Sequence, residues 1–415
     1  MLPSLQSLFG LLVFLLTCYL FSENKTAINT RLIIVSLLLQ FALALVLLKV
    51  PAMQHLFIFL NQVVLQLQLA TEAGTSFLFG FLGGGPLPYE ETVSGASYVL
   101  AFRALPLLLL TSVISALLVY WQILPWIMRL FSLVLERSLG IGGAVGLSVS
   151  ANAFIGMVES PLLIRPYLAR LSRSELFAVM CAGLATVSGT MLALEASVIS
   201  EVVPDAVGHL LSASLITLPG VILIAHLLIP ETGEITTGKT PIGRGADSVM
   251  DAITQGTQNG LTLLMNIIAM IIVMVALVHL VNAVLAQLPP VGGTNITLEG
   301  LLGYLMSPVT WLMGIPWAEA SLTGQLMGTK TILTEFLAYL KLGQIPVDEL
   351  SQRSRIIITY ALCGFANFIS LGIMLTGLII MVPDRRNEIL DLGLKSLLGG
   401  TVATSCTAAI IGVIL

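Results

Sequence analysis

Two glutamates, Glu159 and Glu335, lie inside apolar stretches that are interrupted by glycine. Glu159 follows Gly156 and precedes Ser160-Pro161, whereas Glu335 follows the run Gly328-Thr329-Lys330. A carboxylate in hydrocarbon is costly unless it faces a cavity or a partner. Both glutamates lie at interruptions where backbone groups are already exposed, so we predict that each contacts a ligand or a coupling ion. The competing interpretation is a buried structural ion pair.

Other polar residues extend this set. Asn152, just before Gly156, could offer an amide oxygen and neighbouring free carbonyls to Na⁺, or it could simply cap a helix. Asn367 and Ser370 lie three residues apart on one helical face, so both could reach one hydroxyl-rich ligand. The run from Thr186 to Thr190 lies mid-span, where Ser and Thr more often pack helices than bind anything.

The sequence does not indicate an enzyme. Gly146-Leu147-Ser148 lacks the glycine that would complete a nucleophile motif, and the four histidines are scattered without HExxH spacing. The four cysteines lie in apolar stretches without CxxC spacing, which argues against a disulfide framework or a zinc site.

Composition identifies the solvent that surrounds the chain. Of 415 residues, 10% are charged and 57% belong to the hydrophobic set. Soluble domains carry roughly 25% charged residues, so this chain cannot cover a water-facing surface. A net charge of −4 without a basic patch indicates no nucleic-acid partner. The partner solvent is the lipid bilayer.

These residues must be positioned by membrane helices, which makes the fold class an all-α polytopic membrane protein. A bilayer crossing needs about 20 apolar helical residues. Eight crossings are predicted at 4–22, 30–50, 98–122, 175–203, 207–229, 259–285, 355–382 and 393–415. The first lacks a basic start and a cleavage site, so we interpret it as a membrane segment rather than a removed signal. The semi-polar stretch 51–96 is predicted to form interfacial helices and a loop.

Two further stretches, about 140–170 and about 300–340, are apolar but interrupted midway by glycine and ionisable residues. Such segments exist at membrane depth only where protein or a wet cavity surrounds the freed backbone. Both are predicted to be re-entrant hairpins. The chain then divides into an N-terminal region 1–97, a first half 98–230, a cytoplasmic linker 231–257 and a second half 258–415 with 259–285 as a scaffold helix.

Positive charge predicts the orientation, because short cytoplasmic loops carry an excess of Lys and Arg. Three loops carry such an excess and should be cytoplasmic. The first contains Lys25 and Arg31, the second Arg165, Arg170 and Arg173, and the third Arg385, Arg386 and Lys395. Both termini are therefore predicted to be periplasmic.

The two broken hairpins form a repeat. Glu159 and Glu335 each precede a span with a polar, small-residue middle, which opens at Cys181-Ala182-Gly183 and at Cys363-Gly364-Phe365. Matched pairs of interrupted segments indicate a secondary transporter with internal repeats and a midplane binding site. An odd number of crossings between the halves would make the repeats inverted. A channel would more naturally show rings of filter residues.

From about residue 100 onward, the chain resembles the concentrative nucleoside transporters. The motifs that carry the resemblance are Phe102-Arg103-Ala104-Leu105-Pro106, Asn266-Ile267-Ile268-Ala269-Met270, Gly328-Thr329-Lys330 with Glu335-Phe336-Leu337-Ala338-Tyr339, and Cys363-Gly364-Phe365-Ala366-Asn367-Phe368. The second-hairpin motif is close to the family pattern G-x-K-x-x-x-N-E-F-V-A-Y, with Thr334 in place of its asparagine.

The resemblance implies a homotrimer with eight transmembrane helices, two re-entrant hairpins in inverted repeats, and Na⁺- or proton-driven nucleoside uptake by an elevator movement. By motif, it implies that Glu335 holds the ribose hydroxyls with Asn367 and Ser370 beside it, and that Phe365 lines the site. It implies a sodium site formed by Asn152, the Ile155 carbonyl, Thr186 and the Val187 carbonyl.

One departure concerns nucleobase recognition. The family's hairpin reads G-Q-T-E-[AS]-P, whereas this chain reads Gly156-Met157-Val158-Glu159-Ser160-Pro161. Met157 and Val158 cannot replace the hydrogen bonds of Gln and Thr, so selectivity for a pyrimidine should weaken. We predict a sodium-driven nucleoside importer of the bacterial inner membrane. Proton coupling, purine or modified nucleosides, and an uncoupled channel or facilitator are the alternatives.

Overall fold

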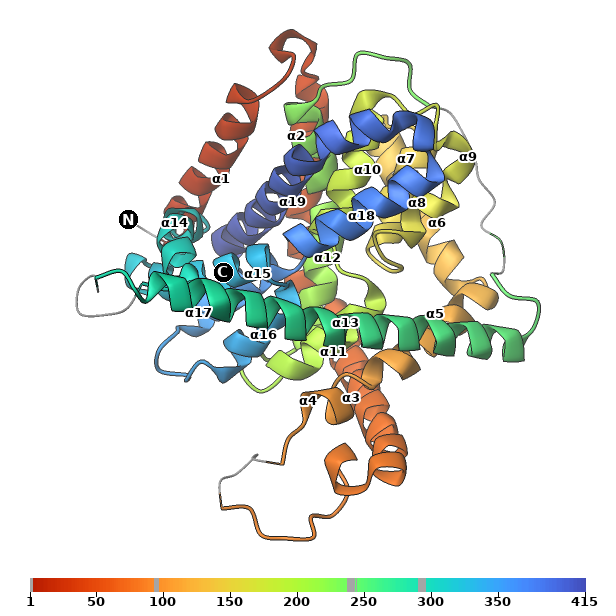
Figure 1. Cartoon of the computed structure of the whole chain (residues 1–415). Coiled ribbons are helices and arrows are strands. Elements are labelled where there is room, and N and C mark those ends of the chain that lie inside the picture. The colour runs from red at the N-terminus through yellow and green to blue at the C-terminus, as the bar shows by residue number, and fades with distance from the viewer. Residues whose placement is uncertain (1–2, 93–96, 237–242, 244, 290–295) are drawn as a thin grey trace.

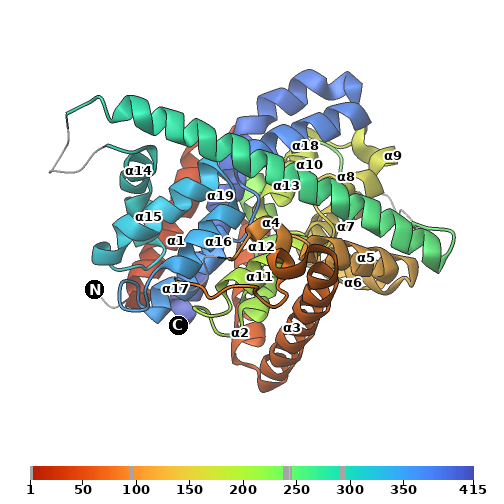
Figure 2. The ribbon, with the colours of Figure 1, turned by 60° about the horizontal axis from the view of Figure 1, so that its bottom comes forward.

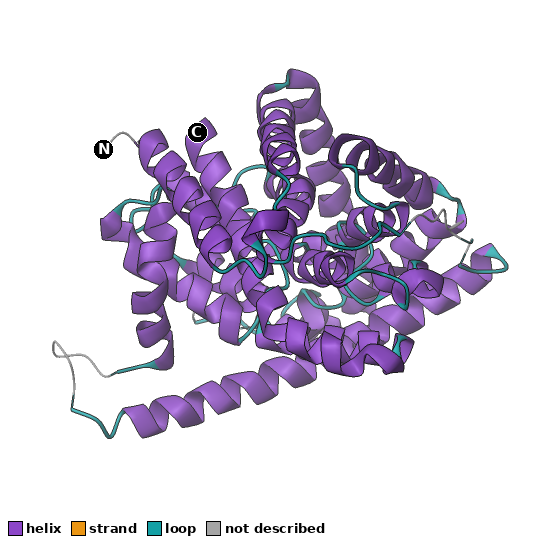
Figure 3. Ribbon diagram, turned by 90° about the horizontal axis from the view of Figure 1, so that it is seen from above, coloured by secondary structure: helices purple, strands orange, loops and turns teal. Residues whose placement is uncertain are grey.

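The computed structural model describes residues 3–92, 97–236, 243, 245–289 and 296–415. Helices connected by loops build all of this described part, and it contains no strand (Figure 3). Eight of its helical segments are long and apolar enough to cross a membrane. The predicted all-α polytopic fold is confirmed.

Three helices form the N-terminal region: α1 (Pro3–Leu20), α2 (Thr30–Lys49) and α3 (Pro51–Phe79). The predicted interfacial helices within 51–96 are instead one helix of 29 residues, which projects at the bottom of Figure 1 and continues into a short 3-10 turn, η2 (Gly80–Gly83). Its glutamines lower its hydropathy, so composition alone underestimated its length. Pro51 occupies its first turn, where the missing N–H costs nothing.

The remaining helices repeat one order of elements. Each half opens with helices that precede a re-entrant pair, which is followed by a span broken in its middle and by a closing span. The first half contains α4 (Leu100–Arg103), α5 (Leu107–Tyr120), α6 (Ile123–Leu139), α7 (Gly143–Asn152), α8 (Glu159–Leu163), α9 (Arg165–Leu168), α10 (Arg173–Ala185), α11 (Gly189–Ile199) and α12 (Ala206–Leu228). The second contains α13 (Val249–Leu285), α14 (Leu298–Leu312), α15 (Trp317–Ile332), α16 (Glu335–Gln344), α17 (Gln352–Leu362), α18 (Phe368–Met381) and α19 (Arg386–Ile414).

The two halves are inverted, as their contacts with α19 show. The broken span of the first half begins at Arg173, which pairs with Asp391 near the start of α19. The broken span of the second half begins beside Arg353, whose guanidinium donates to the Gly412 carbonyl near the end of α19. Equivalent helices therefore start at opposite ends of α19, so the predicted inverted repeat is confirmed.

Two predicted crossings are broken rather than continuous. Within 175–203 the helix stops after Ala185 and restarts at Gly189, and within 355–382 it stops after Leu362 and restarts at Phe368. Ser188 and Asn367 supply the side-chain caps for the restarts. Since Ser and Asn bond to backbone groups outside helices, they favour caps over helix interiors.

The scaffold helix is longer than predicted. Ser248 caps α13 by accepting a hydrogen bond from the Asp251 amide at 3.1 Å, so the helix begins at Val249 instead of residue 259. The predicted linker 231–257 is correspondingly shorter, because its residues from Val249 onward belong to α13. Its residues 237–242 and 244 lie outside the described part. Figure 2 shows α13 crossing the other helices, and its side chains pack mainly against α5.

The three loops rich in Lys and Arg gather at one end of the molecule. Arg173 Nη2 lies 3.0 Å from Glu23 Oε1 and 2.6 Å from Asp391 Oδ2, and Lys395 Nζ lies 2.7 Å from the same Glu23 oxygen. Arg385 donates to the carbonyls of Leu168 and Leu171. The start of α1 and the end of α19 lie together at the opposite end of these two helices, where a Cβ atom added to Gly412 would lie 2.4 Å from Ser7 Oγ (Figure 1). One side of the membrane must therefore hold all three loops.

The Glu23 cluster generates a pH-dependent prediction. Hydrogen bonding to Arg173 lowers the pKa of the Glu23 carboxyl below its usual value. Its stabilising effect is therefore present above that usual value, about 4.3, and is lost as the pH falls through the lowered pKa. Glu23→Gln should lower the melting temperature in detergent by about 1–2 °C at pH 7, and the difference should vanish below about pH 3.

Glu349→Gln serves as the control, because Glu349 is exposed and forms no ion pair with any described residue. It should leave the melting temperature unchanged at both pH values. A Glu23→Gln effect of the same size at pH 7 and pH 3 would contradict the role of this ion pair.

Candidate functional site

The break between α10 and α11 faces the tip of the first hairpin. Thr186 ends α10 in an extended conformation, and Ser188 caps α11. The Gly189 amide donates to the Phe154 carbonyl at 3.0 Å, which ties the hairpin tip to the break. Gly156 turns the tip with φ of +115°, a conformation that favours glycine. The interrupted segment therefore has partners in protein, as membrane depth requires.

The two broken spans also touch each other. Gly364, in the break between α17 and α18, has φ of +149°. A Cβ atom added there would lie 2.8 Å from the carbonyl carbon and oxygen of Ala185, the last residue of α10. Such an approach of two backbones requires glycine. The breaks from the two repeats thus meet inside the protein.

Glu335 and Asn367 form a buried pair at two helix starts. Glu335 is the first residue of α16, and Thr334 caps that helix by accepting from the Leu337 amide at 3.3 Å. Asn367 caps α18 through its Oδ1, which accepts from the Ser370 amide at 2.7 Å, while its Nδ2 donates to Glu335 Oε2 at 2.8 Å. Two helix N-termini and an amide donor therefore offset part of the cost of burying the Glu335 carboxylate.

Thr334 is informative because it replaces the asparagine of the family pattern. Its hydroxyl supplies the cap that α16 needs. Ser370 lies in the first turn of α18 and is buried. The structure thus brings Glu335, Asn367 and Ser370 together, with Phe365 buried in the same break.

A lysine lies behind this pair. Lys330 is fully buried, and its Nζ donates to the Ala361 carbonyl at 2.7 Å and contacts Thr404 Oγ1 at 3.4 Å. Ala361 lies in the last turn of α17, where free carbonyls favour a cation. Lys330 and Glu335 also interact electrostatically. Sequence reasoning had counted Lys330 only as an interruption, although a lysine within a membrane segment was signal enough to assign it a partner.

Asn152 lies at the end of α7 with an unsatisfied side chain. It is 1% exposed, and neither its Oδ1 nor its Nδ2 bonds to any described residue. Ser148 and Ser150 on the same helix and Ser160 beyond the tip also have buried hydroxyls without a described partner. Buried polar groups are normally bonded, so this side of the hairpin is a candidate ion or ligand site.

Met157 and Val158, where the first hairpin departs from the family pattern, lie against α18. A Cβ atom added to Gly183 would lie 3.2 Å from both Met157 Cβ and Met374 Sδ, and one added to Gly377 would lie 3.2 Å from a Val158 methyl. Met374 is seven residues beyond Asn367, about 10 Å along the helix. The hairpin motif and the Glu335 pair therefore flank one stretch of α18. Glu159 itself is exposed in the described chain.

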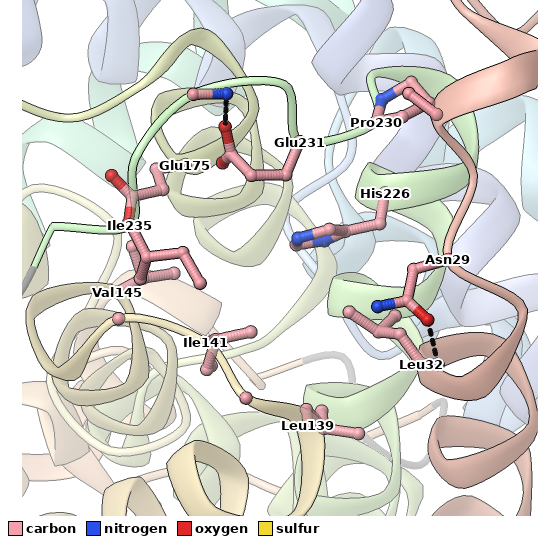
Figure 4. A pocket seen from close by; sticks show the side chains of 14 residues that line it. Asn29, Leu32, Leu139, Ile141, Val145, Glu175, His226, Pro230, Glu231 and Ile235 are labelled. Carbon is pink, nitrogen blue, oxygen red and sulfur yellow. Dashed lines mark hydrogen bonds between the residues drawn. The ribbon is translucent and has the colours of Figure 1, made fainter.

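Two cavities in the described part of the chain lie away from these residues. One, of about 270 Å³, is lined by Asn29, Glu175, His226 and Glu231 near the loop-rich end (Figure 4). The other, of about 320 Å³, lies between α3 and the start of α12. Neither includes Glu335 or Asn367.

Some intramembrane charges are not part of the site. Glu319 accepts a hydrogen bond from the Ser351 hydroxyl, and Arg103 donates to the Phe81 carbonyl. Glu195, by contrast, lies within electrostatic reach of Glu335 and Lys330. The position of Glu195 in the sequence did not indicate these interactions, because Glu335 and Lys330 belong to the other half and approach Glu195 only in the folded chain.

Comparisons with known proteins place this arrangement in a family. Three family models match: the Na⁺-dependent nucleoside transporter N-terminus over residues 9–82, a nucleoside recognition model over 101–203, and the Na⁺-dependent nucleoside transporter C-terminus over 209–412. The chain belongs to the concentrative nucleoside transporter family. This confirms the resemblance drawn from the motifs.

Full-length relatives agree with the family assignment. The nucleoside permease NupC of Helicobacter pylori is 33% identical over 99% of this chain and 97% of its own length. An uncharacterized transporter of Bacillus subtilis, YutK, is 37% identical over 98% of both chains. The inward-facing, substrate-bound structure of CNTnw has a TM-score of 0.89 and 33% identity, covering 99% of this chain and 98% of that one. The chain is therefore a multi-pass nucleoside transporter of this family and not an enzyme.

The crossing of the two breaks generates a prediction. Gly364→Ala should lower the melting temperature and weaken nucleoside binding together, because its Cβ would enter the Ala185 backbone. Overpacking of this kind typically costs about 1–3 kcal/mol. Thermal unfolding and nucleoside binding in detergent would measure both effects.

Gly372→Ala is the matched control on α18, since a Cβ there meets nothing within 4 Å. It should be neutral in both measurements. A Gly364→Ala protein with unaltered stability and binding would show that the two breaks do not need to touch.

Proposed function

We propose that this transporter is a Na⁺-driven nucleoside symporter that imports nucleosides across the bacterial inner membrane. The observation that carries the substrate assignment is the buried Glu335–Asn367 pair, held at two helix N-termini in a family of nucleoside transporters. A carboxylate is acceptor-only and can receive two hydrogen bonds from vicinal hydroxyls such as those of ribose. Asn367 and Ser370 add polar groups beside it, and Phe365 adds an apolar wall.

Sodium fits the residues of the first hairpin. Asn152 has a buried amide oxygen without a described partner, at the C-terminal end of α7 where backbone carbonyls are free. Ile155 lies in the tip beyond it, and Thr186 and Val187 lie in the extended break that the tip contacts. Hard oxygen ligands from half-helix ends suit Na⁺. These four residues would hold the coupling ion, and the family models name Na⁺ dependence.

Coupling then follows from shared structure. The hairpin tip that would bind Na⁺ continues into Met157, Val158 and Glu159, which would face the base. Ordering of the tip by Na⁺ lowers the cost of forming the nucleoside site, and by linkage the nucleoside strengthens Na⁺ binding equally. Proton coupling in place of sodium remains the alternative within transport.

Alternating access is proposed to be an elevator movement within a homotrimer. CNTnw structures similar to this chain are described as inward-facing, intermediate and outward-facing, which supports alternating access. The apolar residues that α13 exposes, such as Ile272 and Val284 at 64% and 70% exposure, need lipid or neighbouring subunits as cover. The orientation that places the Lys- and Arg-rich loops in the cytoplasm places both termini in the periplasm.

The sodium assignment is tested by uptake of radiolabelled uridine and adenosine into proteoliposomes. Uptake should accumulate against a gradient when Na⁺ is supplied outside. Asn152→Ala should raise the half-saturating Na⁺ concentration by about tenfold or more, because one oxygen ligand is lost. Asn387→Ala, which changes an exposed asparagine at the start of α19, is the control.

The alternatives give different results in the same assay. Uptake that is unchanged when Na⁺ is replaced and a proton gradient is imposed would support proton coupling instead. Equilibration without accumulation would support an uncoupled facilitator.

The substrate assignment is tested by binding. Glu335→Gln should weaken nucleoside binding about 100-fold, since two hydrogen bonds to a charged group are weakened. Met157→Gln should change it less than about tenfold and should favour pyrimidines, because it restores an amide. Competition by purine, pyrimidine and modified nucleosides would measure both effects, and equal losses in the two variants would contradict this map of the site.

A further inference from the structure

Glu195 is a buried carboxyl group that the proposed transport cycle does not use. It lies in α11, is 0% exposed, and neither carboxylate oxygen bonds to any described residue. It interacts electrostatically with Glu335 and Lys330. An ionised carboxylate in such surroundings is strongly disfavoured, whereas the neutral acid is not.

The three charges differ in what supports them. Glu335 has the Asn367 amide and a helix N-terminus, both of which favour the carboxylate. Lys330 has the Ala361 carbonyl and Thr404, which favour the ammonium. Glu195 has no such partner in the described chain. Two carboxyl groups and one ammonium group have no net charge only when one carboxyl group keeps its proton. Glu195 is the carboxyl group that should keep it, because it is buried without a hydrogen-bond partner in the described chain.

The other titratable groups near Glu195 already have partners. Tyr339 on α16 donates to the Thr359 carbonyl at 2.7 Å, and Cys363 contacts the Leu210 carbonyl at 3.6 Å. Both interact electrostatically with Glu195. The elements packed on α11 carry further titratable residues, none with a described interaction with Glu195: His55 and Glu72 on α3, Tyr120 on α5, His209 and His226 on α12, and Lys341 on α16.

We propose that Glu195 is a positioning residue that holds a proton behind the nucleoside site and thereby makes nucleoside binding proton-linked at alkaline pH. The proton keeps the buried cluster neutral while Glu335 stays ionised to accept the ribose hydroxyls. This inference rests on the proposed function of Glu335. Loss of the proton to solvent breaks the O–H bond of Glu195 and leaves an unpartnered buried anion next to the site.

The sign of the pH effect follows from linkage. The conformation that buries Glu195 binds its proton more tightly than a conformation that hydrates it, so rising pH disfavours the buried conformation. The Glu335–Asn367 pair belongs to that conformation. Nucleoside affinity should therefore fall at alkaline pH, by up to about tenfold per pH unit for one proton.

The test measures the dissociation constants of uridine and adenosine with saturating Na⁺ from about pH 5 to about pH 10, between the ordinary pKa values of glutamate and lysine side chains. The alkaline limb is read from adenosine, because the N3–H of uridine itself ionises at the upper end of this range. Wild type should lose affinity at both ends of this range. Glu195→Gln, which imitates the neutral acid, should keep the acid limb and lose the alkaline limb. Glu201→Gln, an exposed glutamate just beyond α11, should behave as wild type.

Two outcomes would overturn the inference. One is an alkaline limb that persists in Glu195→Gln, which would assign it to Lys330 or Tyr339. The other is a wild-type affinity that does not change up to about pH 10. A wild type that binds neither nucleoside at any pH would instead contradict the proposed function.

Infrared difference spectroscopy keeps the inference testable if Glu195→Gln does not fold. Nucleoside-bound wild type should show the band of a protonated carboxyl at about pH 7.5, where solvated glutamate is ionised, and the band should disappear as affinity falls. Absence of that band in the wild type would contradict a proton on Glu195.

Discussion

A helix that stops inside a bilayer leaves backbone donors and acceptors that no water can satisfy, and this constraint organises the whole site. Both broken spans meet it with short polar residues, Ser188 and Asn367, which cap the restarting helices. At the hairpin tip, the Phe154 carbonyl accepts a hydrogen bond from the Gly189 amide. The breaks must be buried in protein, and they pack against each other. The backbones of Gly364 and Ala185 approach so closely that a Cβ atom on Gly364 would lie 2.8 Å from the Ala185 carbonyl.

The same constraint concentrates charge. Free amides at the starts of α16 and α18 favour an anion, and Glu335 lies there with Asn367 as its donor. Free carbonyls at the end of α17 favour a cation, and Lys330 lies there. A helix break in the membrane thus makes a pair of oppositely polarised ends, one suited to an anion and the other to a cation. Asn367 serves the fold and the site with one side chain, since its oxygen caps α18 while its amide holds Glu335.

The positions where prediction and structure differ share a cause. Hydropathy averages over a window, so the glutamines of α3 concealed a continuous helix, and the polar start of α13 was assigned to a linker although Ser248 caps a helix there. Hydropathy likewise joined α17 to α18, because a five-residue break barely changes the average. Capping chemistry is local, and the structure shows caps at Ser248, Ser188 and Asn367, residue types that favour that position. Glu195 could not be assigned, since its neighbours Glu335 and Lys330 come from the other repeat.

The sequence by itself determined the membrane environment, the paired interruptions and the residue types of the site, because composition, glycine placement and motif spacing depend only on the order of residues. The family resemblance added the prediction of a ribose side, with Glu335 and Asn367, and of an altered base side, with Met157 and Val158. Only the tertiary structure decided which charges share one buried cluster and which polar groups lack partners. That difference is physical: the cost of a buried charge depends on neighbours that two inverted repeats bring together across more than a hundred residues of chain.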